Sequence, residues 1–343
     1  MHSRRDHGWN RREFLRTLSL AGTAGFLGLR PELFAAEPPP ETTKITLRRT
    51  TVLCHAPVHL AEALLKFEGF TEVHFKETAR GEAVPPAEAL ASGEVQIMMQ
   101  FAGPLLLRVD AGDPILILSG GHIGCQELFA HESVRSVRDL KGKTVILATT
   151  PGAGPHTFLA TVLAHVGLDH RKDVKVLWLS IAEGMRAFEE RKADAYMGGS
   201  GLRPEFRTKW MRRMIVNSTT DRPWSQYFCC MVAGNREWVR KHPIATKRAL
   251  RAILKSADIC ALEPQRAART LVDQGFTTRY AQAVQELREL PYGKWREYDP
   301  EDTVRFYSLR LHEAGMIKSN PQKIIAQGTD WRFLRELKKE IKG

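Results

Sequence analysis

The stretch "VILATTPGAGPHTFL" (residues 145–159) is typical of a strand, a glycine-rich turn and the start of a helix. Pro155 suits a first helical turn, where its missing N–H costs nothing. Gly152 and Gly154 let the backbone approach a ligand closely. The free N–H groups at a helix start attract a small anion or a polar oxygen. The stretch therefore predicts α/β structure with a loop that holds a small ligand, and a ligand-free tight turn is the alternative.

Two nucleotide-binding patterns do not fit this loop. A P-loop needs the pattern G-x-x-x-x-G-K-[ST] between a strand and a helix, but Gly142-Lys143-Thr144 precedes the strand and position 137 is Val. The dinucleotide fingerprint needs a third glycine where this loop has Thr157. The sequence therefore argues against nucleotide binding.

Strands and helices alternate on both sides of the opening stretch. Expected strands in the first block are 44–53, 72–78, 95–100 and 114–121, and in the second block 144–149, 174–179, 193–197 and 213–217. A long apolar strand, "QYFCCMVAGN" (226–235), follows, and the pattern is then helical to the end. Alternation of this kind predicts parallel α/β architecture. The helical tail predicts that the chain crosses back to cover the first block.

The composition is that of an ordinary soluble protein with room for two domains. Of the 343 residues, 43% are hydrophobic and 26% are charged, with a formal net charge of +12. The densest basic cluster, "KWMRRM" (209–214), is interpreted as a solvated face, so no nucleic-acid partner is expected. The odd number of cysteines and the absence of a C-x-x-C pattern argue against a disulfide framework and a cysteine zinc site. Cys229 and Cys230 are interpreted as small core residues.

The N-terminus carries an export pattern. In "NRREFLRTLSLAGTAGFLGL" (10–29), Arg11-Arg12 precedes a weakly apolar stretch, Leu18 to Leu29, that is too short to span a bilayer. It resembles a twin-arginine signal, which addresses folded cargo to a translocase. We therefore expect a signal peptide over 1–36, a proline-rich linker over 37–43 and a periplasmic protein. A basic amphipathic helix at the start of a cytosolic protein is the alternative.

Four further segments carry a family resemblance. They are "ALASGEVQI" (89–97), "SVRDLKGKTV" (136–145), "HVGLD" (165–169) followed by "DVKVL" (173–177), and "AFEERKADAYM" (187–197). In this order, over about 44–290, the chain resembles solute-binding proteins of ABC importers of the nitrate, taurine and aliphatic-sulfonate group, whose fold also includes binders of thiamine-pyrimidine precursors. The resemblance implies a two-lobed periplasmic-binding-protein type II fold with a hinge and a helical C-terminal extension. Lobe 1 would be 44–125 plus 226–343, and lobe 2 would be 126–225.

The resemblance also implies a small anion in the cleft between the lobes and an ABC permease in the inner membrane as partner. His55, His59, His122 and His156 all lie in segments expected to end strands or start helices. The expected ligand-binding residues are His55, Ala56, Pro57, Phe101, Ala102, Gly121, His122, Gly154, His156, Ser200, Gly201, Trp224 and Tyr227. We expect a monomer without a cofactor, a bound metal or catalysis.

Two alternatives stay open. A metal-binding carrier would use His55 and His59, whose spacing of four puts them on one face of a helix. An exported enzyme would use His122 or His156 with Glu183, although no G-x-S-x-G elbow or paired-carboxylate pattern fixes a reaction. A related enzyme class in this fold makes a thiamine precursor from a histidine and a vitamin B6 cofactor, but it is cytosolic, and the export signal argues against it.

Overall fold

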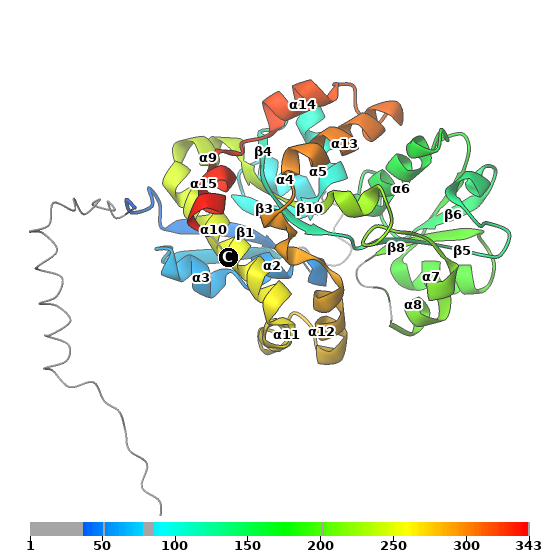
Figure 1. Cartoon of the computed structure of the whole chain (residues 1–343), viewed down its shortest axis with the longest axis horizontal. Helices are drawn as coiled ribbons and strands as arrows, with labels where there is room; N and C mark the ends of the chain where they lie inside the picture. The colour runs from blue at the N-terminus through cyan, green and yellow to red at the C-terminus, as the bar shows by residue number, and fades with distance from the viewer. Residues whose placement is uncertain (1–36, 51, 78–85, 200–201, 203, 342–343) are drawn as a thin grey trace, which may run out of the picture. The chain divides into compact units, whose positions relative to one another are not determined.

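Two five-stranded sheets organise the chain, each flanked by helices (Figure 1). The structure, a computed structural model, describes residues 37–50, 52–77, 86–199, 202 and 204–341, so the expected signal peptide lies outside the described residues. Residues 39–343 form one compact unit that contains both sheets. No helix among the described residues has both the length and the apolar composition needed to cross a membrane.

Sheet A has the strand order β2-β1-β3-β10-β4. Strand β1 (Lys44–Arg49) pairs in parallel with β2 (Glu72–Glu77) and β3 (Ile97–Phe101). Strand β10 (Phe228–Asn235) lies antiparallel between β3 and β4 (Ile115–Ile123). Strands β3, β4 and β10 are buried along their whole length, which explains why they are continuous apolar runs rather than alternating ones.

Sheet B repeats the same plan in the order β7-β6-β8-β5-β9. Strand β6 (Thr144–Leu147) is parallel to β7 (Lys175–Trp178) and β8 (Ala195–Gly199), while β5 (Gln126–Ala130) is antiparallel to β8 and β9 (Met214–Asn217). The expectation of purely parallel sheets was therefore wrong for one strand in each sheet. The reason is that β5 enters sheet B directly from β4 of sheet A, and β10 returns to sheet A directly from β9.

Local differences from the predicted elements concern the first block. The predicted strand 44–53 ends at Arg49, and the following helical segment divides into η2 (Leu53–His55), α2 (Ala56–His59) and α3 (Glu62–Phe67). The strand predicted over 114–121 runs further than expected, because β4 continues through Ile123. Gly120 fits there because the Phe228 ring occupies its side-chain position, where a Cβ would lie 2.4 Å from the ring.

The helices of the C-terminal region pack on the helices of the first block (Figure 1), as the helical tail predicted. Helix α10 (Pro243–Leu262) contacts α2 and α3, and α13 (Pro300–Glu313) and α14 (Pro321–Gly328) contact α5 (Ala102–Asp110). The remaining helices around sheet A are α4 (Pro86–Ala91), α9 (Arg236–Lys241), α11 (Pro264–Asp273), α12 (Tyr280–Glu289), η6 (Tyr292–Arg296) and α15 (Arg332–Glu340). Those around sheet B are η3 (Val137–Leu140), α6 (Gly154–His165), α7 (Ile181–Glu189), α8 (Pro204–Trp210), η4 (Met211–Arg213) and η5 (Trp224–Gln226).

Apolar packing joins the two halves beside the strand crossings. Helix α6 of the sheet-B half contacts α5 and α13 of the sheet-A half. Phe158 on α6 meets Phe101 edge-on, with ring centroids 6.0 Å apart, and Trp224 at 5.3 Å. Gly103 permits this approach, because a Cβ there would lie 2.4 Å from Oγ1 of Thr157. The two halves are thus held together by a shared apolar contact.

His59 is a buried titratable group in the core of the sheet-A half. Its ring stacks on Phe276 with centroids 4.5 Å apart. Burial lowers the pKa of His59 to about 3, and the charges of His55 and Arg49 add to the effect. Below about pH 6.5 the unfolded chain protonates this imidazole and the folded chain does not, so its contribution to stability is complete above that pH and falls as the pH drops toward 3.

We predict that the unfolding free energy of His59→Leu falls less than that of the wild type as the pH drops below about 6.5. At about 1.36 kcal/mol per unit, the wild-type group loses about 2 kcal/mol of unfolding free energy between pH 6.5 and pH 5. Urea denaturation at both pH values measures this difference. Leu65→Val, a packing change in the neighbouring helix, should lower stability equally at both pH values. An unchanged pH slope in His59→Leu would contradict the assignment.

Candidate functional site

A cavity of about 220 Å³ lies between the two sheets, at the ends of strands from both halves. The sheet-A half contributes the segment after β1, the end of β3 and one residue of β10. The sheet-B half contributes the start of β5, the segment after β6, the starts of α6 and α7, and β8 with Leu202 beyond it. The lining residues are Val52, Cys54, His55, Gln100, Phe101, Cys125, Gln126, Ala148, Thr149, Ala153, Gly154, Pro155, Ile181, Tyr196, Met197, Gly198, Gly199, Leu202 and Cys230.

The N-terminus of helix α6 opens onto this cavity. Ala153, Gly154 and Pro155 line it, and Ala153 is the N-cap residue, with no side-chain hydrogen bond to the helix. Helix α7 differs, because the side chains of Ser180 and Glu183 cap its first turn reciprocally. An uncapped helix start presents N–H groups and the positive end of the helix dipole. Because the start of α6 lines the cavity, a ligand oxygen there can accept from N–H groups of its first turn, to which Pro155 contributes none.

Two further polar groups in the lining lack partners. Oε1 of Gln126 and the hydroxyl of Tyr196 are buried without a hydrogen-bond partner among the described residues. Nε2 of Gln126 makes only a contact of 3.8 Å with Sγ of Cys125. Buried polar groups are normally hydrogen-bonded in native proteins. Because Gln126 and Tyr196 lie on the cavity wall, their free groups can pair with a ligand that both donates and accepts hydrogen bonds.

The titratable groups of the described lining are one imidazole, three thiols and a phenol. Hydrogen bonds with Cys125 and Cys230 hold the pKa of the Cys54 thiol well below its usual range. His55 has hydrogen bonds at both ring nitrogens: Nδ1 lies 3.0 Å from Oγ1 of Thr50, and Nε2 lies 3.7 Å from Sγ of Cys230. Burial, with the charge of Arg48 nearby, lowers the pKa of His55 to about 4, so the imidazole is uncharged at neutral pH. Among the described lining residues there is no lysine, arginine or carboxylate. Because an unpaired buried charge is costly, this arrangement favours a ligand with at most one charge.

Three of the expected site residues meet in this cavity. His55, Phe101 and Gly154 line it from both halves. Ala56 and Ala102 directly follow lining residues in the chain, and Pro57 follows Ala56. All three are buried at the starts of α2 and α5, outside the lining. These backbone positions therefore help to place their lining neighbours.

The other expected residues lie elsewhere. Gly121 and His122 are inside β4 of sheet A. His156 accepts a hydrogen bond at Nδ1 from the Gly152 N–H, at 2.9 Å, and its ring lies against His170 and Trp178. Trp224 and Tyr227 pack on Phe306 of α13. Ser200 and Gly201 lie outside the described residues.

Sequence reasoning missed Gln100, Gln126, Tyr196 and Met197, which line the cavity from both halves. Gln100 and Met197 are near the C-terminal ends of β3 and β8, a position that the strand-end rule identifies in principle. Gln126 and Tyr196 gave no usable signal. Gln126 starts β5 (Gln126–Ala130), which was not among the predicted strands. Tyr196 lies on a strand whose sequence is that of an ordinary buried core strand.

The residues of the two alternatives do not assemble. His59 stacks on Phe276 and is not a lining residue. Glu183 caps α7, where its carboxylate accepts from the hydroxyl of Ser180 at 2.6 Å. No hydrogen bond or ion pair joins Glu183 to His122 or His156 in the described part of the chain.

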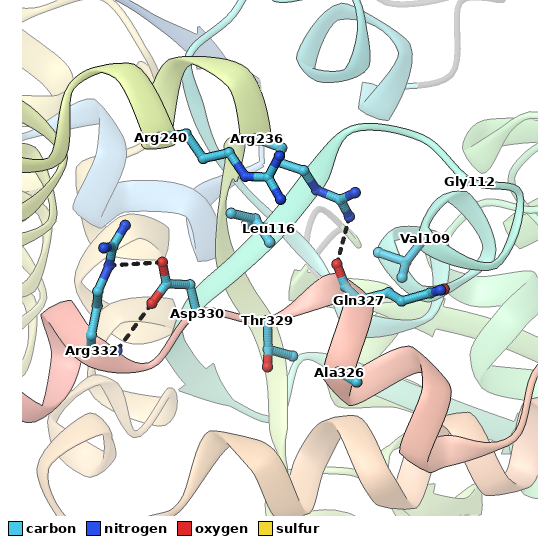
Figure 2. A pocket seen from close by; sticks show the side chains of 10 residues that line it. All are labelled: Val109, Gly112, Leu116, Arg236, Arg240, Ala326, Gln327, Thr329, Asp330 and Arg332. Atoms are coloured by element: carbon cyan, nitrogen blue, oxygen red, sulfur yellow. Dashed lines mark hydrogen bonds and ion pairs between the residues drawn. The ribbon is translucent and has the colours of Figure 1, made fainter.

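A larger hollow of about 720 Å³ lies within the sheet-A half, between β4, α5, α9, α14 and the start of α15 (Figure 2). Its polar groups serve mainly to hold these elements together. Arg236 donates to the backbone oxygen of Gln327 at 2.5 Å, and Arg332 pairs with Asp330 at 3.0 Å. It takes no residue from the sheet-B half, so we assign the ligand site to the cavity between the sheets.

An ion pair connects the two halves beside the cavity. Arg207 on α8 contacts Glu127 on β5 at 2.6 Å and also pairs with Glu289 on α12. The Glu127 side chain is only 7% exposed. Burial raises the pKa of Glu127, and the hydrogen bonds from Arg207 offset only part of that effect. Arg207 therefore compensates a buried carboxylate and links α12 of one half to α8 of the other.

We predict that removing Arg207 and removing the charge of Glu289 lower the unfolding free energy by different amounts. Arg207→Met leaves Glu127 buried without its cation, which should cost about 3 kcal/mol of unfolding free energy at pH 7. Glu289→Gln removes a carboxylate that is 36% exposed and should cost less than about 1 kcal/mol. Urea denaturation measures both values. The double variant Glu127→Gln, Arg207→Met should recover part of the loss, and equal losses for the two single variants would refute this reading.

Comparisons with known proteins agree on one fold. A family described as NMT1/THI5 like matches residues 72–267. The periplasmic nitrate-binding protein NrtA from Synechocystis PCC 6803 is similar in structure, with a TM-score of 0.68 at 14% identity over 89% of this chain and 90% of that one. The alkanesulfonate-binding protein SsuA from Xanthomonas axonopodis pv. citri, bound to MOPS, gives 0.63 at 18% identity over 87% of this chain and 100% of that one.

An enzyme shares the architecture. The desulfurization enzyme DszB gives a TM-score of 0.60 at 12% identity over 87% of this chain and 99% of that one. A comparison of the sequence with curated proteins gives no match. At these identities the likeness establishes the two-lobed α/β fold of the periplasmic binding proteins, which the sequence predicted, with helices in the C-terminal region.

Proposed function

The chain belongs to the NMT1/THI5-like family, and from that membership, the two-lobed fold and the cavity between the sheets we propose that it is the exported solute-binding component of an ABC importer. It captures a small anion between the lobes and delivers it to a permease in the inner membrane. The observation that carries the proposal is the uncapped start of α6 at a cavity lined by both halves.

The ligand is a monoanion with an apolar part. Its oxygens accept from the α6 N–H groups and from the hydroxyl of Tyr196, and an N–H or O–H of the ligand donates to Oε1 of Gln126; these two side-chain atoms lack partners among the described residues. Its apolar part lies against side chains such as Phe101, Met197 and Leu202. A doubly charged anion would bury more charge than the neutral dipoles of this lining stabilise. Sulfonates and carboxylates of this kind fit, and NrtA and SsuA bind anions on the same fold.

Ligand capture proceeds through motion of the lobes, which we place at 44–125 plus 226–343 and at 126–225. The hinge is the pair of crossings between β4 and β5 and between β9 and β10. A ligand that contacts both halves stabilises the closed arrangement, and its differential affinity sets the population shift. The closed monomer then presents a surface that the permease binds. No step of this cycle requires a cofactor or catalysis.

The export route follows from the N-terminal segment. Arg11 and Arg12 direct the folded chain to the twin-arginine translocase, and the mature protein works in the periplasm. We predict that the double change Arg11→Lys, Arg12→Lys leaves the protein in the cytoplasm. Fractionation of cells followed by immunoblotting measures this. Arg16→Lys is the matched control and should export normally, and export of the double variant at the wild-type level would exclude this route.

The ligand class is tested by thermal shift and calorimetry on a panel of alkanesulfonates, carboxylates, nitrate, bicarbonate and pyrimidines. A ligand at 100 times its Kd adds about 2.7 kcal/mol to the unfolding free energy. We expect organic monoanions to raise the Tm and sulfate, the dianionic control, to have a smaller effect. A panel in which only neutral pyrimidines bind would contradict the anion assignment.

We predict opposite effects of Ala153→Asp on stability and on binding. The new carboxylate caps α6, which should add about 1 kcal/mol of unfolding free energy. The same carboxylate accepts the hydrogen bonds that the ligand would otherwise accept, and its charge repels the anion. Because a hydrogen bond to a charged group contributes about 1.5–3 kcal/mol, anion affinity should fall by about 10- to 100-fold.

Ala153→Asn is the matched control for this change. It caps the helix without a charge, so it should stabilise the protein similarly and weaken anion binding less than the aspartate does. Calorimetric titration with the best monoanion of the panel measures both affinities. Wild-type affinity in a stabilised Ala153→Asp protein would place the anion somewhere other than the start of α6.

A further inference from the structure

Four soft donor groups converge at one side of the cavity. One side-chain donor atom from each of Cys54, His122, Cys125 and Cys230 lies within 4.8 Å of all the others. Cys54, His122 and Cys230 are buried, and Cys125 is partly buried. They come from η2, from β4, from the crossing between β4 and β5, and from β10. The fold, not the local sequence, therefore assembles the cluster, which is why the cysteine spacing argued against it.

His122 has the bonding of a metal ligand. Its Nδ1 lies 3.1 Å from the backbone oxygen of Ile123, to which it donates. That leaves Nε2 as the lone-pair nitrogen, and Nε2 is buried without a hydrogen-bond partner among the described residues. Metal-ligating histidines commonly donate their second ring nitrogen to a carbonyl in this way. Tyr292 packs edge-on against the ring at 5.3 Å and helps to hold its orientation.

The backbone places the thiols with some strain. Cys125 has a φ of +83°, which is uncommon for a residue with a Cβ, and it follows Gly124 at +84°. Residues held in such conformations occur preferentially at functional sites. Cys230 and His122 are cross-strand partners in the β4–β10 ladder. The crossing segment thus brings the thiol of Cys125 to two donors that are fixed in sheet A.

Three thiols and one imidazole form the donor set of a tetrahedral zinc site. Zn–S bonds of about 2.3 Å imply sulfur–sulfur separations of about 3.8 Å in a tetrahedron, so a cluster within 4.8 Å needs a contraction of about 1 Å. Soft thiolates select Zn²⁺ over hard cations such as Mg²⁺ and Ca²⁺. We propose that Cys54, His122, Cys125 and Cys230 bind one zinc ion, which fastens the β4–β5 crossing to sheet A.

The site has a definite consequence for the fold. The ion would connect η2, β4 and β10 with Cys125, so it would fix the sheet-A end of the β4–β5 crossing at the wall of the cavity, and bending of that crossing would take place beyond Cys125. Cys229 is the nearest competitor for Cys125, because their sulfur atoms lie 3.0 Å apart. In an oxidising compartment the two could instead form a disulfide, and the experiment distinguishes the two states.

The test uses the full-length chain, stripped of metal and reduced, under anaerobic conditions. Co²⁺ serves as the spectroscopic probe and Zn²⁺ is titrated in competition with a chromophoric chelator. We expect one ion per chain, an intense tetrahedral Co²⁺ spectrum and thiolate-to-cobalt charge transfer. A weak octahedral spectrum, or no bound ion, would overturn the proposal. The metal titration needs no anion, so a failure to bind zinc can be distinguished from a failure of the proposed transport function.

Four variants locate the ligands. Cys54→Ser and Cys230→Ser should each lower zinc affinity by more than about 100-fold, since even loss of an outer-shell partner costs about 10- to 100-fold. The matched controls Cys229→Ser and Cys260→Ser keep the tetrad and should retain the wild-type spectrum. If Cys229→Ser abolished binding while Cys230→Ser did not, the assignment would be wrong.

Peptide mass mapping of wild-type protein, purified without reductant and without chelator, removes any dependence on variants that fold poorly. We expect thiols in Cys54, Cys125 and Cys230 together with one bound zinc per chain. A Cys125–Cys229 disulfide without metal would overturn the proposal.

Discussion

The arrangement of this protein depends on two strands that are each shared between the halves of the chain. Strand β5 leaves sheet A and becomes an inner strand of sheet B, and β10 leaves sheet B and becomes an inner strand of sheet A. Each has backbone hydrogen bonds on both sides, to β8 and β9 or to β3 and β4. The chain cannot unpair either strand without exposing two ladders of polar groups, so the crossings fix where the two halves meet.

The chemistry of the cavity follows from that meeting point. The crossings bring Cys125, Gln126 and Cys230 beside the strand ends and the start of α6. Because burial keeps His55 neutral and the described lining has no lysine, arginine or carboxylate, recognition falls to backbone N–H groups, an amide and a hydroxyl. Fixed dipoles of this kind stabilise a single negative charge without the desolvation cost of a buried ion pair. Arg207, outside the lining, instead compensates Glu127 and links the halves.

The periodicity of the sequence was enough to predict the α/β class, two blocks of strands and a helical C-terminal region. Pro243 and Pro300 are the first residues of helices α10 and α13 in that region. Strand β5 was not predicted at all, and the direction of β10 was not predictable, because direction depends on which sheet accepts the strand. Strand ends pointed to His55, Phe101 and Gly154, which the cavity brings together.

Other residues depend on tertiary contacts that no local pattern carries. His156 looked like a ligand residue but accepts from the Gly152 N–H, and the strand predicted over 114–121 runs further than expected, with Gly120 against the Phe228 ring. The cysteines of the tetrad are far apart in the chain, and their grouping requires η2, β4 and β10 to be in place. Spacing rules recognise metal sites only when neighbouring ligands share one element.

Hydrogen–deuterium exchange with and without the best-binding monoanion tests the central claim most directly. It shows whether the ligand binds in the cavity between the sheets or in the larger hollow of the sheet-A half. We expect the ligand to slow amide exchange in peptides covering the start of α6 and the end of β8, both of which line the cavity between the sheets. Peptides over 326–332, which line the hollow shown in Figure 2, should exchange unchanged. Protection of 326–332 without protection of α6 would contradict the account and move the ligand site to the sheet-A half.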